Sequence, residues 1–187
     1  MRLTSYVIRH GRTVRSWDTL GYTELTRLLR LEDDPPPNMR YLIDSLDAEL
    51  VRGLGIHMVY TSPLRRALET AKYISRLAGV GLKVLPSLVE VRFDGIPRET
   101  YDKGKRSMRV YLVGESLSTP RKVDLSAIGD GALLVTHGFL MRHIYSGLFG
   151  VPVRSLSSSP IFTTYLSGFE MQSGNGVSLL KAAALRG

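Results

Sequence analysis

Short apolar runs alternate with longer periodic segments along this chain of 187 residues. The runs at residues 3–9, 56–61 and 132–136 are rich in aliphatic and β-branched side chains, which predicts buried strands. Apolar residues recur at helical spacing over residues 40–54 and 139–148, which predicts two amphipathic helices. Strands that alternate with helices in this way are typical of a parallel sheet joined by helical crossovers.

A third helix is expected directly after the strand at 56–61. Its apolar stripe comprises Leu64, Ala67, Leu68, Ala71, Ile74 and Leu77. Ser62 is the predicted cap and Pro63 the predicted first residue, because proline is favoured at the first helical position. Gly79 is the predicted end, since glycine readily adopts the left-handed conformation that follows many helices.

Three other segments carry weaker patterns. Residues 161–185 are expected to form two further strands around a polar turn at 173–176. Residues 32–38 combine acidic residues with three consecutive prolines, which predicts a stiff connection. Residues 96–131 mix polar and apolar positions without a firm period, so this stretch is expected to be irregular.

These elements together predict an α/β fold. The expected arrangement is a three-layer α/β/α sandwich with a mostly parallel central sheet, because strands that are buried on both faces need helices on each side. The length suits one sizeable hydrophobic core, so residues 1–187 are expected to form a single domain. No apolar run approaches the ~20 residues that span a bilayer, and the start of the chain lacks a signal-peptide pattern. We therefore expect a cytoplasmic protein with no membrane partner.

The amino-acid composition excludes several kinds of site and favours one class of partner. The chain contains no cysteine, which excludes a disulfide framework, a thiolate nucleophile and a cysteine-based zinc site. The formal net charge of +8 favours an anionic partner, either a phosphorylated small molecule, a phosphoprotein or nucleic acid. The basic residues are spread along the chain instead of being gathered in one tail, so nucleic acid is the least favoured of the three.

The carboxyl ends of the three predicted core strands carry polar residues. His10, Ser62 and His137 each lie just past one of these strands. Ligands bind open α/β sheets at the carboxyl ends of the strands, at the point where the strand order reverses. We therefore expect the three segments to converge on one crevice.

The most informative of these segments is Arg9-His10-Gly11. The Arg9 guanidinium can hold phosphoryl oxygens in a bidentate manner, and the His10 imidazole offers a nitrogen nucleophile. Gly11 leaves space for the backbone to approach an anion. The triplet therefore predicts a site at which a phosphoryl group is bound and attacked.

Two later segments supply further groups. Arg65 and Arg66 lie in the first turn of the third predicted helix, near the positive end of its dipole, and only one of them needs to face the crevice. Thr136-His137-Gly138 repeats the arrangement of strand, histidine and glycine and provides a second imidazole. A protein that only binds anions gains little from a nucleophilic imidazole, so these residues favour an enzyme over a binding module.

Taken together, these motifs resemble the histidine phosphatase superfamily, whose fold is phosphoglycerate-mutase-like. The matching segments are Arg9-His10-Gly11 with Thr13, Ser62-Pro63-Leu64-x-Arg66-Ala67-x-x-Thr70-Ala71, and Val135-Thr136-His137-Gly138. The resemblance implies a phosphohistidine mechanism in which His10 attacks the phosphorus atom. It also implies that the equatorial phosphoryl oxygens are bound by Arg9, Arg66 and His137.

The resemblance further implies a substrate-binding set of Gly11, Thr13, Ser16 and Gly138. The family often has an asparagine where this chain has Ser16, so a phosphate hydrogen bond must be made differently or by a hydroxyl. No metal ion and no other cofactor is implied.

A general acid is implied by Leu88-Val89-Glu90 together with Phe93-Asp94-Gly95, which fit the family's Leu-x-Glu segment and aromatic-glycine pair. Glu90 would protonate the leaving oxygen and then act as the base that activates water. The alternative acids are Asp94, Glu99 and Glu115.

Several alternatives stay open. A phosphatase acting on phosphate monoesters or on phosphoproteins is preferred to a phosphoglycerate-type mutase, because mutase members commonly carry an inserted segment that this chain lacks. A protein phosphohistidine phosphatase and a non-catalytic phosphate or nucleic-acid binding module are the other candidates, and no oligomeric state is encoded in these motifs.

His57 and His143 are expected to be structural or surface residues. The basic residues of the 96–131 stretch, interleaved with tyrosines, predict either a solvated face or a substrate-selecting lid.

Overall fold

The computed structural model describes residues 4–15, 19–118, 123–156 and 159–171. Within these residues a five-stranded sheet has the order β3-β2-β4-β1-β5. Its strands are β1 (Ser5–Arg9), β2 (Met58–Thr61), β3 (Gly81–Val84), β4 (Ala132–Thr136) and β5 (Gly168–Met171). The first four strands pair in parallel, and β5 runs antiparallel to β1. The prediction of a mostly parallel sheet is therefore confirmed.

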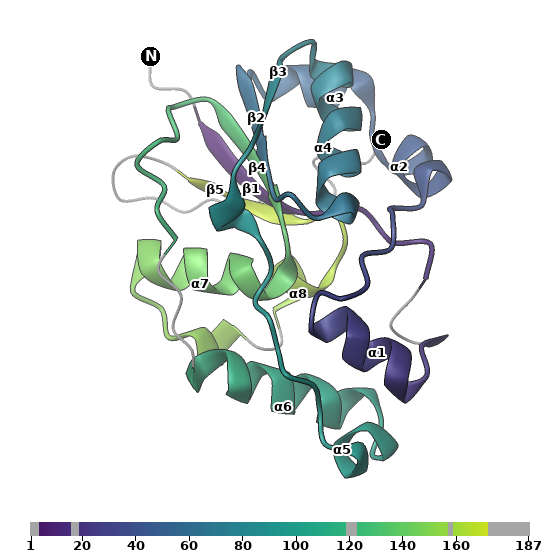
Figure 1. The fold of residues 1–187 in the computed structure, drawn as a ribbon. Helices are drawn as coiled ribbons and strands as arrows, with labels where there is room; N and C mark the ends of the chain where they lie inside the picture. The colour runs from purple at the N-terminus through teal and green to yellow at the C-terminus, as the bar shows by residue number, and fades with distance from the viewer. Residues whose placement is uncertain (1–3, 16–18, 119–122, 157–158, 172–187) are drawn as a thin grey trace.

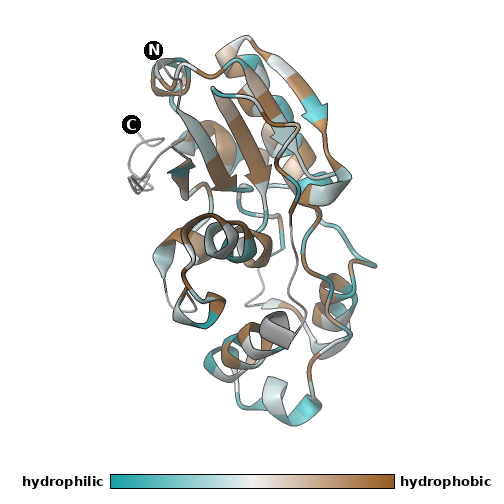
Figure 2. Ribbon diagram, turned by 90° about the vertical axis from the view of Figure 1, so that its left-hand side faces the viewer, coloured by the Kyte–Doolittle hydropathy of each residue, from teal (hydrophilic) through white to brown (hydrophobic). Residues whose placement is uncertain are grey.

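Helices cover both faces of this sheet (Figure 1). One face packs against α2 (Met39–Ser45), α3 (Ala48–Gly53) and α4 (Arg65–Ala78), and the other packs against α7 (Gly138–Phe149) and α8 (Pro160–Thr163). Along β1, Tyr6 and Ile8 enter the first core while Val7 enters the second, as the alternation of side chains along a strand requires. Hydrophobic residues accordingly dominate the central strands in Figure 2. The three-layer α/β/α sandwich is thus confirmed.

A third apolar cluster lies apart from the sheet, at the lower end of Figure 1. It joins α1 (Tyr22–Leu29) to α6 (Lys105–Ser118), with the short helix α5 (Arg98–Asp102) beside them. Leu25 and Leu112, both fully buried, belong to this cluster. It positions α1 and α6 as walls of the pocket described below. The 3-10 helices η2 (Pro86–Leu88) and η3 (Val153–Leu156) complete the described elements.

The prediction of one helix over residues 40–54 is wrong, because the chain forms α2 and α3 with a break at Leu46 and Asp47. The Asp47 carboxylate accepts hydrogen bonds from the backbone N–H groups of Glu49 at 2.7 Å and Leu50 at 2.9 Å. These are the free donors of a helix start, so Asp47 caps a new helix. The predicted apolar spacing is only partly buried, because Leu42 and Leu46 face the core while Ile43 and Leu50 are exposed and Val51 is buried in their place.

The predicted start of the third helix at Pro63 is also wrong. Helix α4 begins at Arg65 with Leu64 as its cap residue, because Ser62 still continues β2 through a hydrogen bond from its N–H to Val135 O (3.2 Å). The Ser62 hydroxyl oxygen accepts from Leu64 N–H instead of capping a helix at Pro63. The end of α4 is as predicted, since Gly79 adopts the left-handed conformation with φ of 70°.

The expectation of an irregular 96–131 stretch is wrong over α5 and α6. Along α6, Met108, Leu112 and Val113 are buried against the third cluster, while Val110 is 68% exposed. An exposed valine obscures the helical period, so the pattern alone does not identify the helix. The sequence pattern predicts neither α1 nor β3.

The last expected strands are only partly present. Helix α8 occupies the start of the 161–185 segment, and β5 supplies one strand. The second expected strand, with its turn at 173–176, lies outside the described residues. Within the described residues no helix is both long and apolar enough to cross a bilayer. A single domain over residues 1–187 stays a prediction.

Candidate active site

The three strand ends meet as the sequence predicts. His10 continues β1 through a hydrogen bond from its N–H to Thr136 O (2.9 Å), which places it beside the end of β4. The rings of His10 and His137 lie 5.1 Å apart between centroids, and His137 Nε2 lies 2.9 Å from the Ser62 hydroxyl oxygen. Parallel pairing of β2, β4 and β1 brings their carboxyl ends to the same edge, so tertiary structure unites residues far apart in sequence.

His10 is held in one tautomer by its own neighbour. Its Nδ1 lies 2.7 Å from the carbonyl oxygen of Gly11, which can only accept a hydrogen bond, so Nδ1 carries the proton. Nε2 then keeps its lone pair. Burial, followed by the positive charges of Arg66 and Arg9, lowers the pKa of His10 well below its usual value. The neutral imidazole is therefore the stable form at neutral pH, with a lone pair on Nε2.

Arg9 presents a buried positive charge beside this imidazole. Its Nη1 donates to Thr163 O, and its guanidinium carbon lies 4.3 Å from the centre of the Tyr165 ring. Among the described residues, none forms a hydrogen bond with Arg9 Nε or an ion pair with the Arg9 guanidinium. Burial lowers the pKa of Arg9. The guanidinium is thus positioned by the protein while one of its donors stays available.

Arg66, and not Arg65, faces the pocket. Arg66 Nη1 forms an ion pair with Asp34 Oδ1 at 2.8 Å, and the other Asp34 oxygen accepts from the N–H of Arg65. The Arg65 side chain points outward and pairs with Glu69 at 2.6 Å. Asp34 comes from the 32–38 connection and was not among the predicted site residues. Its carboxylate both caps the start of α4 and holds the Arg66 guanidinium.

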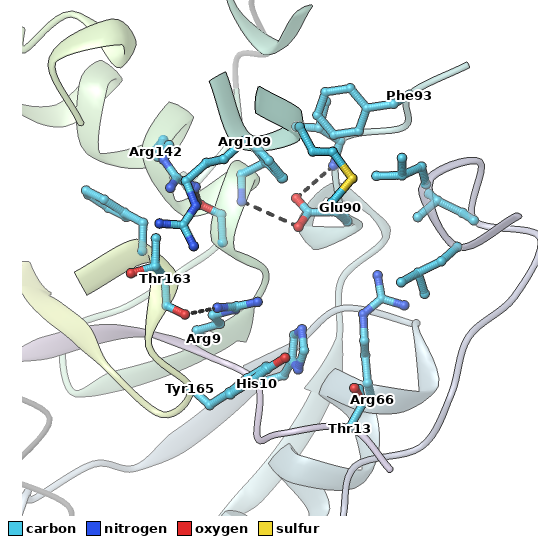
Figure 3. Close-up of a pocket in the computed structure, with 18 of the residues that line it drawn as sticks. Arg9, His10, Thr13, Arg66, Glu90, Phe93, Arg109, Arg142, Thr163 and Tyr165 are labelled. Carbon is cyan, nitrogen blue, oxygen red and sulfur yellow. Dashed lines mark hydrogen bonds between the residues drawn. The ribbon is translucent and has the colours of Figure 1, made fainter. Parts of the chain in front are cut away.

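Glu90 lies at the amino end of α7. Its Oε1 accepts from the N–H groups of Val91 and Leu140, each at 2.9 Å, and its Oε2 lies 3.4 Å from the N–H of Phe139. Burial raises the pKa of Glu90, although these hydrogen bonds and the Arg66 charge oppose the shift. Figure 3 shows Glu90 across the pocket from His10. A carboxyl group with a raised pKa is suited to carry a proton at moderately acidic pH.

A pocket of about 250 Å³ opens between these groups (Figure 3). It brings together six of the predicted site residues, which are Arg9, His10, Thr13, Arg66, Glu90 and Gly138. Thr13 is buried, and its hydroxyl donates to Arg15 O. Gly138 begins α7, where an added Cβ would lie 2.5 Å from Phe162 O. Only a glycine therefore lets the Phe162 backbone pack this closely.

Two predicted residues, His137 and Gly11, do not line this pocket, and Ser16 lies outside the described residues. His137 is fully buried beside His10. The N–H of Gly11 donates to the Thr70 hydroxyl at 3.1 Å, and an added Cβ at Gly11 would lie 2.3 Å from Leu42 Cδ2. Packing of α2 against this turn thus accounts for the glycine.

The alternative acids and histidines also lie elsewhere. The side chains of Asp94, Glu99, Glu115 and His57 are exposed, and none of them lines this pocket. His143 is buried within α7. Among the described residues, no group of three or more histidine and carboxylate side chains is arranged to hold a metal ion.

Sequence reasoning missed several lining residues, above all Arg142. This arginine is 3% exposed, and its Nη1 donates to Gly138 O at 2.8 Å. Burial lowers the pKa of Arg142 to about 10, so the side chain is still positively charged at neutral pH. Its position four residues after Gly138, on the same helix face, was a usable signal. Thr163 at the end of α8 and Tyr165 just after this helix had none, because their segment follows no recognisable pattern.

Lys105 and Arg109 of α6 line the pocket as well. They belong to the basic stretch for which a solvated face and a substrate-selecting lid were both expected. Arg98 of the same stretch follows the first expectation, since it pairs with Asp102 at 3.0 Å on the surface. The stretch therefore contains both solvent-facing and pocket-lining basic residues, and the substrate-selecting lid stays a prediction.

Known proteins resemble this chain in sequence. The sequence profile of the histidine phosphatase superfamily (branch 1) matches residues 5–120. A probable phosphoglycerate mutase, GpmB, of Yersinia pestis (strain Pestoides F) is 25% identical over 174 residues, covering 82% of this chain and 78% of that protein.

Solved structures share the fold. Phosphoserine phosphatase from Entamoeba histolytica, in complex with 3-phosphoglyceric acid, has a TM-score of 0.58 at 16% identity and covers 96% of this chain and 95% of its own. A putative alpha-ribazole-5'-P phosphatase from Escherichia coli str. K-12 substr. MG1655 has a TM-score of 0.59 at 17% identity, with 98% of each chain covered. Since the family profile spans more than half of the sequence and includes His10, Arg66 and Glu90, this chain belongs to the histidine phosphatase superfamily.

Proposed function

We propose that this protein is a phosphatase that hydrolyses phosphate monoesters through a phosphohistidine intermediate on His10. The observation that carries the proposal is the state of His10. Its Nδ1 is committed to the Gly11 carbonyl, its pKa is lowered, and its ring lines a pocket together with Arg9, Arg66 and Glu90. A neutral imidazole with a lone pair on Nε2, facing two guanidiniums, is suited to attack an anionic phosphoryl group.

In the first half-reaction, His10 Nε2 attacks phosphorus and forms the N–P bond while the ester P–O bond breaks. Arg9 and Arg66 stabilise the negative charge on the equatorial oxygens. The Glu90 proton passes to the leaving oxygen, so that an alcohol departs instead of an alkoxide. The raised pKa of Glu90 supports this role, because it keeps the carboxyl group protonated above its usual range.

In the second half-reaction, a water molecule attacks the phosphorus atom of phosphohistidine. The Glu90 carboxylate takes a proton from this water, the N–P bond breaks, and inorganic phosphate leaves with both groups restored. His137 packs against the His10 ring, and its Nε2 lies within hydrogen-bond distance of the Ser62 hydroxyl, so its proposed role is to hold the His10 ring in place. Binding of the phosphoryl oxygens by His137 stays a prediction. The basic side chains supply the positive charge that a metal ion provides in other phosphatases, so we propose a reaction without metal.

The pocket favours small substrates. Its volume of about 250 Å³ is below the ~300–1,000 Å³ of pockets for drug-sized ligands. A phosphorylated small molecule therefore fits the proposal better than a phosphoprotein. The second candidate function is a phosphoglycerate-type mutase, supported by the name of the Yersinia relative.

The experiment is a hydrolysis assay of the purified chain with nitrophenyl phosphate and 3-phosphoglycerate, with and without a chelator. We expect phosphate release that persists in chelator, together with an acid-labile phosphoryl group on His10 found by mass spectrometry of quenched enzyme. His10→Ala should abolish both signals, whereas His57→Ala, an exposed histidine outside the pocket, should keep them.

Each alternative has its own signature in this assay. Conversion of 3-phosphoglycerate to 2-phosphoglycerate without phosphate release would indicate the mutase. Phosphate binding with no turnover of any ester would indicate a binding module. Activity that disappears with chelator and returns with added metal would contradict the metal-free reaction.

A further inference from the structure

One short segment, between α8 and β5, holds Arg9 at both its backbone and its side chain. Arg9 N–H donates to Ser167 O at 2.9 Å, and Leu166 N–H donates to Arg9 O at 3.2 Å. The Arg9 side chain is held by the same segment, since its Nη1 donates to Thr163 O at the end of α8. Tyr165 lies between these contacts in sequence. The segment therefore brings one aromatic side chain to Arg9.

The Tyr165 ring contacts the two residues that bind and attack the phosphoryl group in the proposed reaction. The Arg9 guanidinium carbon lies over this ring, 4.3 Å from its centre. The ring centres of Tyr165 and His10 lie 5.8 Å apart, at an interplanar angle of 51°. Figure 3 shows Tyr165 beside both side chains. Tyr165 lines the pocket and is half-buried, so its ring is part of the site.

Arg9 carries a buried charge that needs stabilisation. Burial lowers the pKa of Arg9, and the positive charges of Arg66 and Arg109 lower it further. Among the residues that the structure describes, none forms an ion pair with Arg9. The face of an aromatic ring is the negative part of its quadrupole, and it attracts a guanidinium most strongly where water is excluded. The Tyr165 ring is thus suited to stabilise this charge.

A ring also leaves the donors of the guanidinium available. A guanidinium donates hydrogen bonds from its edge, whereas a ring contacts its flat face. A carboxylate paired with Arg9 would instead occupy the N–H groups that the phosphoryl oxygens need. Arg9 Nε is buried and forms no hydrogen bond with the described residues, so at least one donor is kept for the substrate.

The Tyr165 ring is itself held in place. Tyr41 of α2 packs edge-on against it, with ring centres 6.4 Å apart at an interplanar angle of 74°. Leu166, the next residue, adopts a left-handed conformation with φ of 59°, and the Ser167 hydroxyl oxygen lies 2.6 Å from Thr164 O. A leucine keeps such a conformation only where the surrounding structure holds it. The backbone beside Tyr165 is therefore fixed, and the direction of the ring with it.

We propose that Tyr165 is a positioning residue for the reaction, in which the face of its aromatic ring holds the Arg9 guanidinium beside His10 with donors free for the phosphoryl oxygens. The inference rests on the proposed phosphatase function and assigns this role to the ring of Tyr165. The alternative role for this residue is a hydrogen bond from its hydroxyl to a phosphoryl oxygen. The two roles predict different variants to fail.

The first test separates the ring from the hydroxyl, with nitrophenyl phosphate as substrate. Tyr165→Phe keeps the ring and should keep kcat within about twofold. Tyr165→Leu removes the ring and should lower kcat about threefold to thirtyfold, the range of a desolvated cation–π contact. Inhibition by vanadate, which adopts the geometry of the transferring phosphoryl group, should weaken by the same factor, while KM changes less because Arg9 acts mainly on the transition state. Equal losses in the two variants would assign the role to the hydroxyl and overturn the inference.

Tyr73→Leu is the matched control. Tyr73 is a half-buried tyrosine of α4 that packs against the first core and lies outside the pocket. Its replacement should change kcat and vanadate inhibition less than about twofold. Denaturant titration of both leucine variants separates a loss of folded protein from a loss of rate. Equal losses of kcat in Tyr165→Leu and Tyr73→Leu would reduce Tyr165 to a packing residue and overturn the inference.

A second measurement leaves the shape of the site unchanged. Tyr165→Phe can be made with phenylalanines that carry one, two or three fluorine atoms, which withdraw electrons from the ring face. Each fluorine should lower kcat further, since the attraction between the face and the guanidinium weakens. A kcat that does not depend on fluorination would show that the ring only fills space, and would overturn the inference.

Failure of the proposed function would look different, because the wild-type protein would then hydrolyse neither nitrophenyl phosphate nor any other ester. Calorimetric binding of vanadate would still test the role of the ring. Tyr165→Leu should weaken this binding about threefold or more, and Tyr165→Phe and Tyr73→Leu should leave it within about twofold. Equal affinities in all these variants would overturn the inference.

Discussion

The two walls of the pocket are built in contrasting ways. The inner wall consists of Arg9 and His10 at the end of β1, Gly138 at the start of α7 and Arg66 in the first turn of α4. Hydrogen bonds to neighbouring backbone hold Arg9 and His10. The outer wall consists largely of α1 and α6, which pack through a separate apolar cluster and carry the exposed Lys105 and Arg109. The sheet is buried on both faces, whereas α6 has one face in solvent.

This contrast separates the two tasks of the site. A nucleophile and its oxygen-binding groups must be held to within a fraction of an ångström. Strand ends in a packed sheet provide this precision. The selection of substrates tolerates exposed and more variable segments. The inner wall should therefore control the rate with every substrate, while α6 should control the choice between substrates.

The largest effect should come from the inner wall at Arg66. Arg66→Ala should lower kcat by about a hundredfold to a thousandfold with every phosphate ester, because it removes a charge that stabilises the transition state. Arg65→Ala is the matched control, and it should cost less than about threefold since the Arg65 side chain is exposed and pairs with Glu69. Steady-state kinetics of the two variants checks the ranking. The reverse order would mean that Arg66 does not contact the phosphoryl group.

Glu90 lies between the two walls and should show a loss that depends on the leaving group. Glu90→Gln should slow phosphorylation of the enzyme by an alkyl phosphate about a hundredfold, because an alkoxide is a poor leaving group without a proton donor. The loss should be much smaller for nitrophenyl phosphate, whose phenolate leaves readily. Rapid-quench measurement of the first turnover separates this step from hydrolysis of phosphohistidine. Equal losses for both substrates would exclude Glu90 as the acid.

The pH dependence follows from the same two groups. Attack requires neutral His10, whose lowered pKa places the acidic limb of kcat/KM well below pH 6.5. Proton donation requires protonated Glu90, whose raised pKa places the alkaline limb above pH 4.5. With an alkyl phosphate, kcat/KM should therefore fall as pH rises through the Glu90 pKa. Glu90→Gln should remove this alkaline limb, and a limb that persists in the variant would have to belong to another group.

The smallest effect should come from Asp34, which modulates the inner wall from the 32–38 connection. Asp34→Asn removes a negative charge beside Arg66 and keeps one of the two acceptor oxygens, so one of the two hydrogen bonds, from Arg66 or from the N–H of Arg65, is retained. Inorganic phosphate should then inhibit about threefold to tenfold more tightly, since a partly exposed charge of this kind is worth about 1 kcal/mol. Asp33→Asn removes an equal charge that pairs with the exposed Arg15 and should leave inhibition unchanged. Weaker inhibition in Asp34→Asn would indicate that orientation of Arg66 outweighs charge.

The sequence predicted the inner wall because its signals are local. Arg9 and His10 lie at the end of one short buried strand, and His137 follows another. A few consecutive residues are therefore enough to identify both the strand end and its polar residue. Parallel pairing then forces these ends to one edge of the sheet whatever the details of packing. The alternation of apolar runs and periodic segments also predicted helices on both faces of the sheet, but it predicted neither β3 nor the order of the strands.

The break at Asp47 shows that a capping residue can interrupt a continuous apolar pattern. The apolar spacing over residues 40–54 continues without interruption, which predicts one helix. The carboxylate of Asp47 nevertheless caps a new helix. A capping side chain sets a helix boundary because it accepts hydrogen bonds from the free backbone N–H groups of the first turn. The spacing of apolar positions contains no information about these hydrogen bonds.

The outer wall was decided by tertiary structure. Arg109 lies in a segment whose apolar period is obscured by exposed Val110, and it reaches the pocket only because Met108 and Leu112 pack beside α1. Asp34 meets Arg66 across 32 positions of sequence. By itself, then, the sequence determined the chemistry of the strand ends. Only the folded chain determined which charges surround them, because those contacts join segments that have no periodic relation to one another.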